Sequence, residues 1–263
     1  MNGGPEAPAV RVERRASVVW LTIDRPQSRN ALNPAALAEL RTALAHAQAA
    51  ADVRAIVLTG AGERAFCAGA DLKPGSGSFE PDFAQTTNDF AELLRAGMAC
   101  TLPIVARVNG HCLAGGMGLL AICDLAVASD AALFGLPEVK VGVFPMQVIA
   151  PLRRLIAPRL LDELCLTGEP IGAADAVRAG LINYAVPAGE LDAKGAWLIA
   201  RLVDKSPTAQ RRGKYALRAS ADMSFPEALA FLEGQIATLA LTDDAREGRR
   251  AFTERRPPQW TNR

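Results

Sequence analysis

Short apolar segments that alternate with helical segments constrain the fold of this chain more than any other feature. Residues 55–59, 104–108 and 124–128 are each a short apolar run with the length and composition of a strand. A helix is expected between the first two runs, over residues 82–99. Strands that alternate with helices through the first two-thirds of a chain predict the α/β class.

The N-terminal part adds a hairpin and a capped helix to this pattern. Apolar and polar residues alternate over residues 10–23 around a polar turn, which is typical of two paired strands. Asn33 and Pro34 then provide an N-cap and a first helical residue, and leucines follow at helical spacing. Glycine, proline and serine at residues 74–78 predict a loop.

The last third differs, because it is mainly helical from Pro158 onward, with a short extended piece at residues 182–186. No internal repeat or long linker interrupts the chain. We therefore expect one domain, with a core of residues 1–195 that carries the site and a helical region of residues 196–263. That region is too apolar for a lone surface helix, and we expect it to drive assembly. Its apolar residues include Leu229, Phe231, Leu232, Ile236, Leu239 and Leu241.

Composition argues against several classes of protein. The chain has 29 basic and 28 acidic residues and only 5% aromatic residues, so a nucleic-acid surface is not expected. The longest apolar stretch, residues 112–123, is about half of what a bilayer requires, so no membrane segment is expected. The start of the chain lacks the pattern of a signal peptide, and the five cysteines form no CxxC pair. These features predict a cytoplasmic protein without a metal site.

Two glycine-rich segments, residues 65–73 and 109–119, are the strongest candidates for chemistry. Each follows an expected strand and has small residues where the backbone must approach another group closely. Two such turns can direct two backbone N–H groups at one oxygen, and a helix that begins near Gly115 adds its positive end. The two segments therefore predict an oxyanion hole.

A third segment, residues 134–145, places Glu138 among apolar neighbours. Partial burial there would raise the pKa of the carboxyl toward the range of a general base; the alternative is an exposed glutamate in a turn. Two other motifs favour structural roles. The GxGxxA pattern of residues 60–65 is not followed by an amphipathic helix, which favours a plain turn over a dinucleotide site. His111 lacks a nucleophile on its own side of the chain, so we interpret it as part of a pocket wall.

Several motifs occur in the order and spacing of one known family. They are AFCAGADLK at residues 65–73, NGHCLAGG at 109–116, CDLAVAS at 123–129, FGLPEVKVG at 134–142 and TDDAREGRRAF at 242–252. In these motifs the chain resembles the enoyl-CoA hydratase/isomerase, or crotonase, family, and the resemblance covers nearly the whole chain. It implies a spiral of ββα units with a helical C-terminal trimerisation region. It also implies an acyl-CoA substrate, no metal or redox cofactor, and a homotrimer or a hexamer of two trimers.

The resemblance also assigns roles to individual residues. The backbone N–H groups of Ala70 and Gly115 would form the oxyanion hole, and Glu138 would be the catalytic base. Phe252, with Arg255 or Arg256, would close over the coenzyme A. The substrate-binding residues that the resemblance implies are Ser28, Arg29, Ala31, Ala68, Ala70, Asp71, Leu72, Lys73, Gly115, Gly116 and Pro137.

The chain departs from the family's hydratases at two positions. Those members carry a second glutamate where this chain has Gly118, and a glycine where Met146 follows Pro145. One carboxylate suits a one-base isomerisation of 3-enoyl-CoA to 2-enoyl-CoA, which is the predicted reaction. One alternative is hydration of 2-enoyl-CoA by Glu138, alone or with an acid from residues 80–92. Another alternative is a non-catalytic acyl-CoA binder.

Overall fold

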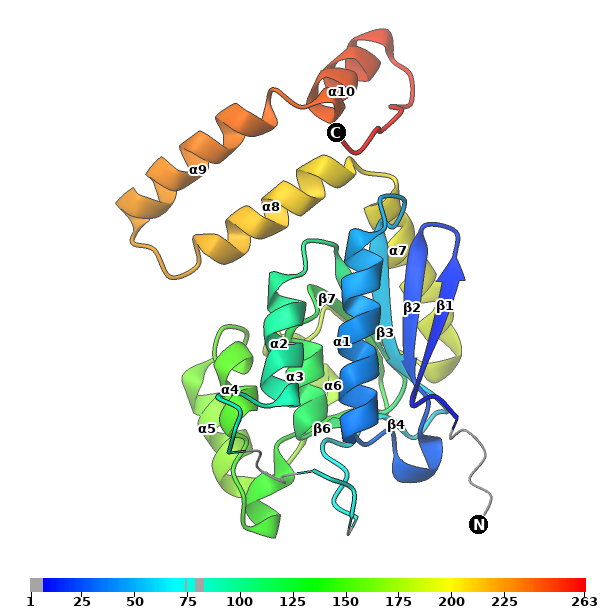
Figure 1. Cartoon of the computed structure of the whole chain (residues 1–263), viewed down its shortest axis with the longest axis vertical. Helices are drawn as coiled ribbons and strands as arrows, with labels where there is room; N and C mark the ends of the chain where they lie inside the picture. The colour runs from blue at the N-terminus through cyan, green and yellow to red at the C-terminus, as the bar shows by residue number, and fades with distance from the viewer. Residues whose placement is uncertain (1–6, 74, 79–82) are drawn as a thin grey trace.

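The computed structural model describes residues 7–73, 75–78 and 83–263, and these form a mixed α/β structure (Figure 1). Within this part of the chain, six strands form the larger sheet, and the first two are an antiparallel hairpin. Each later strand runs parallel to its neighbour, as expected for strands joined through helices. The order across the sheet is β1 (Val10–Arg15), β2 (Val18–Ile23), β3 (Ala55–Gly60), β5 (Ile104–Val108), β7 (Leu125–Ser129) and β10 (Tyr184–Val186).

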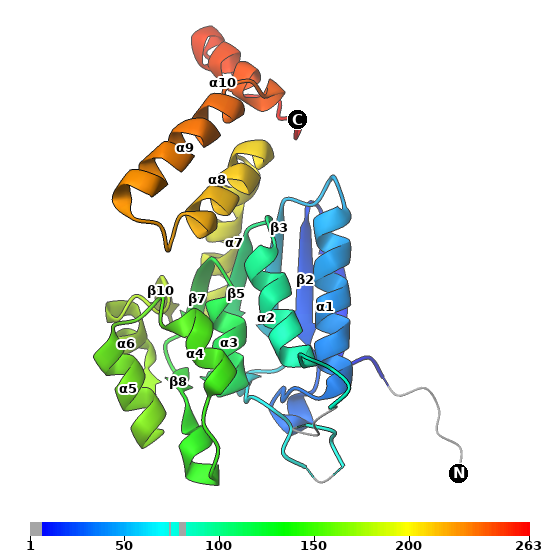
Figure 2. The same cartoon turned by 60° about the vertical axis from the view of Figure 1, so that its left-hand side comes forward.

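Helices cover both faces of this sheet, because successive side chains of a strand point to opposite faces. In β3, Ile56 and Leu58 join the main core, while Ala55 and Val57 contact the helix behind the sheet, α7 (Leu191–Val203). The helices in front are α1 (Pro34–Ala49), α2 (Asp89–Ala99) and α3 (Gly115–Ala121) (Figures 1 and 2).

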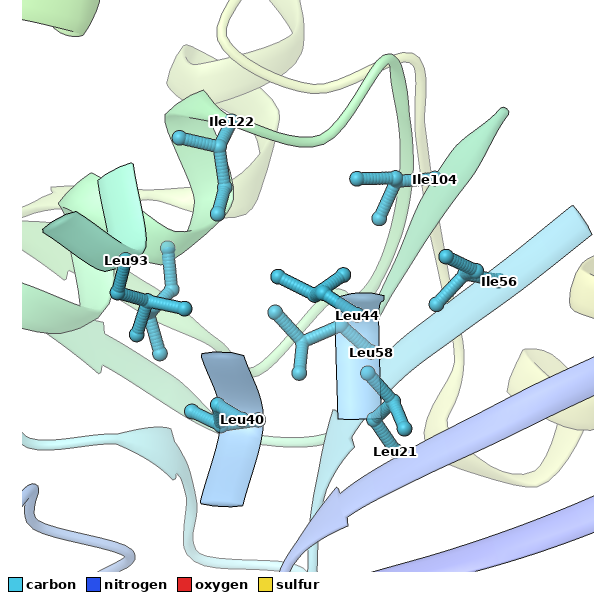
Figure 3. Close-up of a pocket in the computed structure, with 9 residues that line it drawn as sticks. Leu21, Leu40, Leu44, Ile56, Leu58, Leu93, Ile104 and Ile122 are labelled. Atoms are coloured by element: carbon cyan, nitrogen blue, oxygen red, sulfur yellow. The ribbon is translucent and has the colours of Figure 1, made fainter. Parts of the chain in front are cut away.

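The packing of the main core leaves a small gap (Figure 3). The cavity is about 10 Å³, roughly the smallest space that can hold one water molecule. Since its lining is entirely apolar and it is this small, it is not a ligand site. The lining residues are Leu21, Leu40, Leu44, Ile56, Leu58, Leu93, Ile104, Leu119 and Ile122.

A smaller sheet carries the segments that matter for function. Its strands, in spatial order, are β4 (Ala65–Cys67), β6 (His111–Leu113), β8 (Leu133–Gly135) and β9 (Ile171–Gly172). The first three run parallel to one another, and β9 pairs antiparallel with β8. These strands are two or three residues long, too short for the periodicity of the sequence to predict them.

The remaining helices lie on two sides of the core. Three short ones come after β8 in the chain: α4 (Met146–Leu152), α5 (Pro158–Thr167) and α6 (Ala173–Arg178). Three more extend away from the sheets at the end opposite to β4 and β6 (Figures 1 and 2), namely α8 (Pro207–Ala219), α9 (Phe225–Leu239) and α10 (Asp243–Glu254). Single 3-10 turns occur at Pro26–Ser28, Pro137–Val141 and Ala188–Glu190. None of the described helices is long and apolar enough to cross a membrane.

A charged cluster attaches the first of the C-terminal helices to the core. The Lys214 ammonium donates to Asp124 Oδ2 and to the Leu102 carbonyl, both at 2.6 Å, and Arg218 donates to Asp124 Oδ1 at 2.8 Å. The border that the sequence predicts at residue 195, between the core and the C-terminal helical region, lies inside α7 and not at the end of a helix.

Most predicted elements are confirmed, and one helix is corrected. The hairpin is present, and Asn33 caps α1 through the Ala36 N–H, as its position predicts. The helix expected over residues 82–99 begins only at Asp89, because the Asn88 side chain accepts from the Ala91 N–H and caps it there. Residue 82 and residue 74 of the expected loop lie outside the described residues.

Candidate active site

Three parallel strands of the smaller sheet bring the predicted catalytic groups to one edge. Ala70 comes shortly after β4, Gly115 shortly after β6, and Glu138 shortly after β8. Since the carboxyl ends of neighbouring parallel strands meet at the same edge of a sheet, the three segments emerge side by side. Segments far apart in the sequence therefore share one site.

The turn after β4 leaves one backbone donor unused. The Leu32 N–H donates to the Gly69 carbonyl at 2.7 Å, and the Asp71 N–H donates to the Leu32 carbonyl at 2.8 Å. This bridging pattern directs the Ala70 N–H away from Leu32. Within the described part of the chain, no acceptor is bonded to this N–H. It is therefore available to a ligand.

The turn after β6 contacts the turn after β4. Gly69 has φ +92°, and a Cβ there would lie 2.5 Å from the Ala114 Cβ and 3.0 Å from the Gly115 nitrogen. Only glycine fits this approach. Gly115 is the first residue of α3, so its N–H lacks a helical acceptor and lies at the positive end of the helix.

Ala114 lies in a strained conformation between these donors. Its φ is +51°, which costs a non-glycine residue on the order of 1–3 kcal/mol. Two hydrogen bonds of 2.9 Å hold it: its N–H donates to the Gly135 carbonyl, and its carbonyl accepts from the Met117 N–H. The same residue thus connects β6, α3 and β8, the elements that carry Gly115 and Glu138.

Glu138 is half-buried in the 3-10 turn that begins at Pro137. Its Oε2 atom is buried, and no donor among the described residues reaches it. Burial raises the pKa of this carboxyl above its ordinary value, against a smaller opposing effect of a backbone hydrogen bond. Since buried polar atoms are normally hydrogen-bonded, an unsatisfied carboxylate oxygen beside two free backbone donors makes Glu138 a candidate functional group.

Apolar side chains surround Gly118, where the sequence lacks a second carboxylate. A Cβ at Gly118 would lie 3.0 Å from Phe90 Cζ, 3.4 Å from Leu94 Cδ2 and 3.5 Å from Val148 Cγ2. The acids at the start of α2 are paired with arginines instead: Asp89 with Arg41 at 3.4 Å, and Glu92 with Arg95 at 2.6 Å. Of the predicted acid-bearing segment, Glu80 lies outside the described residues.

The predicted coenzyme A-binding residues lie on two loops that contact each other. Lys73 Nζ donates to Ser28 Oγ at 2.9 Å, and the Ala68 N–H donates to the Arg29 carbonyl at 3.1 Å. The ion pair between the partly buried Arg25 and the buried Asp71, at 2.9 Å, joins the same loops, and Arg25 also donates to the Ala31 carbonyl. Leu72 is exposed beside them.

Gly116 has a packing role that does not depend on a ligand. A Cβ on this residue would lie 2.4 Å from the Cys67 carbonyl oxygen, so α3 can approach β4 only with glycine at this position. The close approach keeps the first turn of α3 against the turn that carries Ala70.

Two residues singled out from the sequence have other surroundings in the single chain. His111 is exposed, and its Nδ1 accepts from the Leu133 N–H at 3.2 Å, so it joins β6 to β8. Phe252 is also exposed, on α10 at the end of the molecule opposite to β4 and β6 (Figures 1 and 2), so within one chain it does not lie over this site. Arg256 is paired there with Glu247 and Glu254.

Two residues of the site were not predicted from the sequence. Arg25 lies in the recognisable stretch Asp24-Arg25-Pro26, but its partner Asp71 is distant in the chain. Phe90 belongs to no motif and comes into the site only because α2 packs beside α3. Nothing in a single sequence signals that contact.

Known proteins match this chain over nearly its whole length. A family model described as enoyl-CoA hydratase/isomerase matches residues 13–263. A probable enoyl-CoA hydratase of Mycobacterium tuberculosis is 35% identical over 260 residues, 97% of this chain and 98% of that protein. The 2,3-dehydroadipyl-CoA hydratase of Escherichia coli is 36% identical over 254 residues, 96% and 98% of the two chains. The crystal structure of an enoyl-CoA hydratase of Mycobacterium smegmatis superposes with a TM-score of 0.89 at 34% identity, covering 96% of this chain and 99% of that one.

Proposed function

The chain belongs to the enoyl-CoA hydratase/isomerase family, and we propose that it converts 3-enoyl-CoA thioesters to 2-enoyl-CoA with Glu138 as its single base. It is an enzyme of the crotonase fold. The observation that carries the proposal is the unpartnered, buried Oε2 of Glu138, at the sheet edge where the backbone donors also emerge.

The proposed reaction uses the two backbone donors and the carboxylate in sequence. The thioester oxygen accepts hydrogen bonds from the Ala70 and Gly115 N–H groups, which lowers the cost of negative charge on that oxygen. The Glu138 carboxylate removes a proton from C2, and the electrons left behind delocalise over the C3–C4 double bond and the thioester. The same carboxyl then returns the proton to C4. This leaves a C2–C3 double bond, with no net gain or loss of electrons or protons and no need for a redox cofactor.

Binding of the coenzyme A part is proposed for the loops that join Ser28 to Lys73. Their cationic side chains, Arg29 and Lys73, can pair with phosphate, and backbone groups of residues 68–72 can hold the pantetheine arm. The five cysteine thiols are all free and buried, which supports the proposal of a reducing, cytoplasmic compartment.

Hydration of 2-enoyl-CoA is the second candidate, and the names of the relatives favour it. With Gly118 among apolar side chains, Glu138 would have to deprotonate water and also supply the proton to C2. General acid–base groups typically contribute on the order of 10²–10⁴-fold each, so hydration by one carboxyl should be the slower of the two reactions.

One assay separates these candidates. The purified protein is incubated separately with 3-hexenoyl-CoA and 2-hexenoyl-CoA, and the products are followed by chromatography. Faster conversion of the 3-enoyl substrate supports the isomerase proposal. Formation of 3-hydroxyacyl-CoA without isomerisation supports the hydratase. If neither substrate reacts although acyl-CoA binds tightly, the protein is a non-catalytic binder.

A further inference from the structure

Phe90 occupies a position in the site that no family motif assigns. It is the second residue of α2, and its ring is half-buried with the tip directed at the start of α3. The Cζ atom would lie 3.5 Å from a Cβ on Gly115 and 3.0 Å from one on Gly118. The tip of one aromatic ring therefore lies close both to Gly115, which carries a proposed oxyanion donor, and to the residue one turn further along α3.

In the first turn of α2 the charged side chains face the surface and the aromatic side chain faces the site. This side of the site is therefore apolar. Asp89 and Glu92 pair with arginines at the surface, while Phe90 turns inward. Leu94 and Val148 complete the lining around Gly118. None of these three side chains can position a water molecule or donate a proton.

We propose that Phe90 is the specificity-determining residue of this site: its ring contacts the acyl group of a bound thioester and keeps water from the α3 side of the reacting carbons. The inference rests on the proposed function, because a thioester oxygen held by the Gly115 N–H places the adjoining acyl carbons beside this ring. An apolar wall there favours direct proton return to carbon over addition of water. The residue thus sets the ratio of isomerisation to hydration.

The test compares Phe90→Ala with Met98→Ala, a truncation two turns further along the same helix. Phe90→Ala should raise the ratio of 2-hexenoyl-CoA hydration to 3-hexenoyl-CoA isomerisation at least tenfold. It should also weaken the binding of hexanoyl-CoA by roughly tenfold, as expected for lost contacts of one large apolar side chain, and leave the Kd of free coenzyme A unchanged. Met98→Ala should leave the ratio and both Kd values as in the wild type. A ratio within twofold of the wild type in Phe90→Ala overturns the proposal, whatever happens to binding.

Failure of the proposed function can be told apart from failure of this inference. If the wild type turns over neither substrate, the proposed function is wrong. Hexanoyl-CoA binding then decides the role of Phe90: a selective loss in Phe90→Ala supports contact with the acyl group, and an unchanged Kd overturns it. Phe90→Leu, which keeps an apolar side chain, should have intermediate values, and thermal unfolding of each variant checks that the fold is intact.

Substitution of Gly118, on α3, tests the same contact from the other helix. In Gly118→Glu alone the ring must give by a few tenths of an ångström, since the new Cβ would lie 3.0 Å from Cζ, and it continues to occupy the space beside the new carboxylate. Its gain in hydration should therefore be small, whereas Phe90→Ala/Gly118→Glu should exceed the product of the two single effects at least threefold. Effects that simply multiply would show that the ring does not control this space.

Discussion

Burial of the Glu138 carboxylate without a partner costs stability, and that cost is explained if the carboxylate acts on a substrate. Replacing it by glutamine keeps the size and removes the base, so turnover of the preferred enoyl-CoA should fall by roughly 10²-fold or more. The Kd of hexanoyl-CoA should change little, because the carboxyl oxygen binds no other group in the free protein. Steady-state kinetics measures the turnover, and calorimetry measures the Kd. Full turnover in Glu138→Gln would show that another residue moves the proton.

The raised pKa of Glu138 gives a second test through pH. The unfolded chain loses this proton near the ordinary value of 4.5, and the folded protein loses it at a higher pH because of burial. Between these values the folded state binds more protons, so this residue lowers the free energy of unfolding as pH rises. Glu138→Gln should therefore be more stable than the wild type at pH 7, as measured by urea unfolding. In the wild type, kcat/KM should rise with pH through the raised pKa. Equal stabilities at pH 7 would argue against burial of the charge.

The loops at residues 25–32 and 68–73 act as one element because Arg25 and Asp71 connect them. Burial raises the pKa of Asp71, but hydrogen bonds from Arg25 and from the Lys73 N–H outweigh that effect and lower it. The pair's contribution is therefore complete above pH 3.8 and is lost as pH falls through the lower folded value. Asp71→Ala leaves the partly buried Arg25 with the Ala31 carbonyl but without its carboxylate partner, and should cost about 1–3 kcal/mol of unfolding free energy.

Asp71→Ala should also lower kcat at least tenfold, because Ala70 precedes Asp71 and a small displacement of its N–H weakens the oxyanion hole. Asp52→Ala is the matched control, since it breaks the exposed pair of Asp52 with Arg14, and both measurements should stay at wild-type values. Loss of stability without loss of kcat would mean that the pair holds the loops together but does not position Ala70.

Local patterns predicted the long elements and the motif-bearing turns, and tertiary contacts decided the rest. Asn33 and Pro34 marked the start of α1 because capping is local. The start of α2 at Asp89 is equally local, because the Asn88 side chain caps it, so the sequence carried that signal as well. The three-residue strands β4, β6 and β8, in contrast, exist only because they pair with one another. Glu138 was found from its neighbours. Phe90 and the Arg25–Asp71 pair required the packed structure.

At the scale of the whole molecule, one helix has no place in the core of a single chain. None of the described residues of α9 is buried, and Phe225, Leu229 and Ile236 are exposed on it. Leu217 on α8 and Leu241 after α9 are also exposed, so exposed apolar side chains occur on more than one of the C-terminal elements. Apolar surface of this kind is characteristic of a contact between protein chains.

We therefore predict that the protein assembles through this helical region into a homotrimer or a hexamer of two trimers. Sedimentation velocity at micromolar concentration should find the wild type as one of these species. Ile236→Glu and Leu229→Glu should shift it toward the monomer, because assembly would bury an unpaired carboxylate. Val12→Glu, at an exposed position of β1, the edge strand of the larger sheet, is the control and should leave the assembly unchanged. A monomeric wild type, or full assembly of both α9 variants, would contradict the prediction.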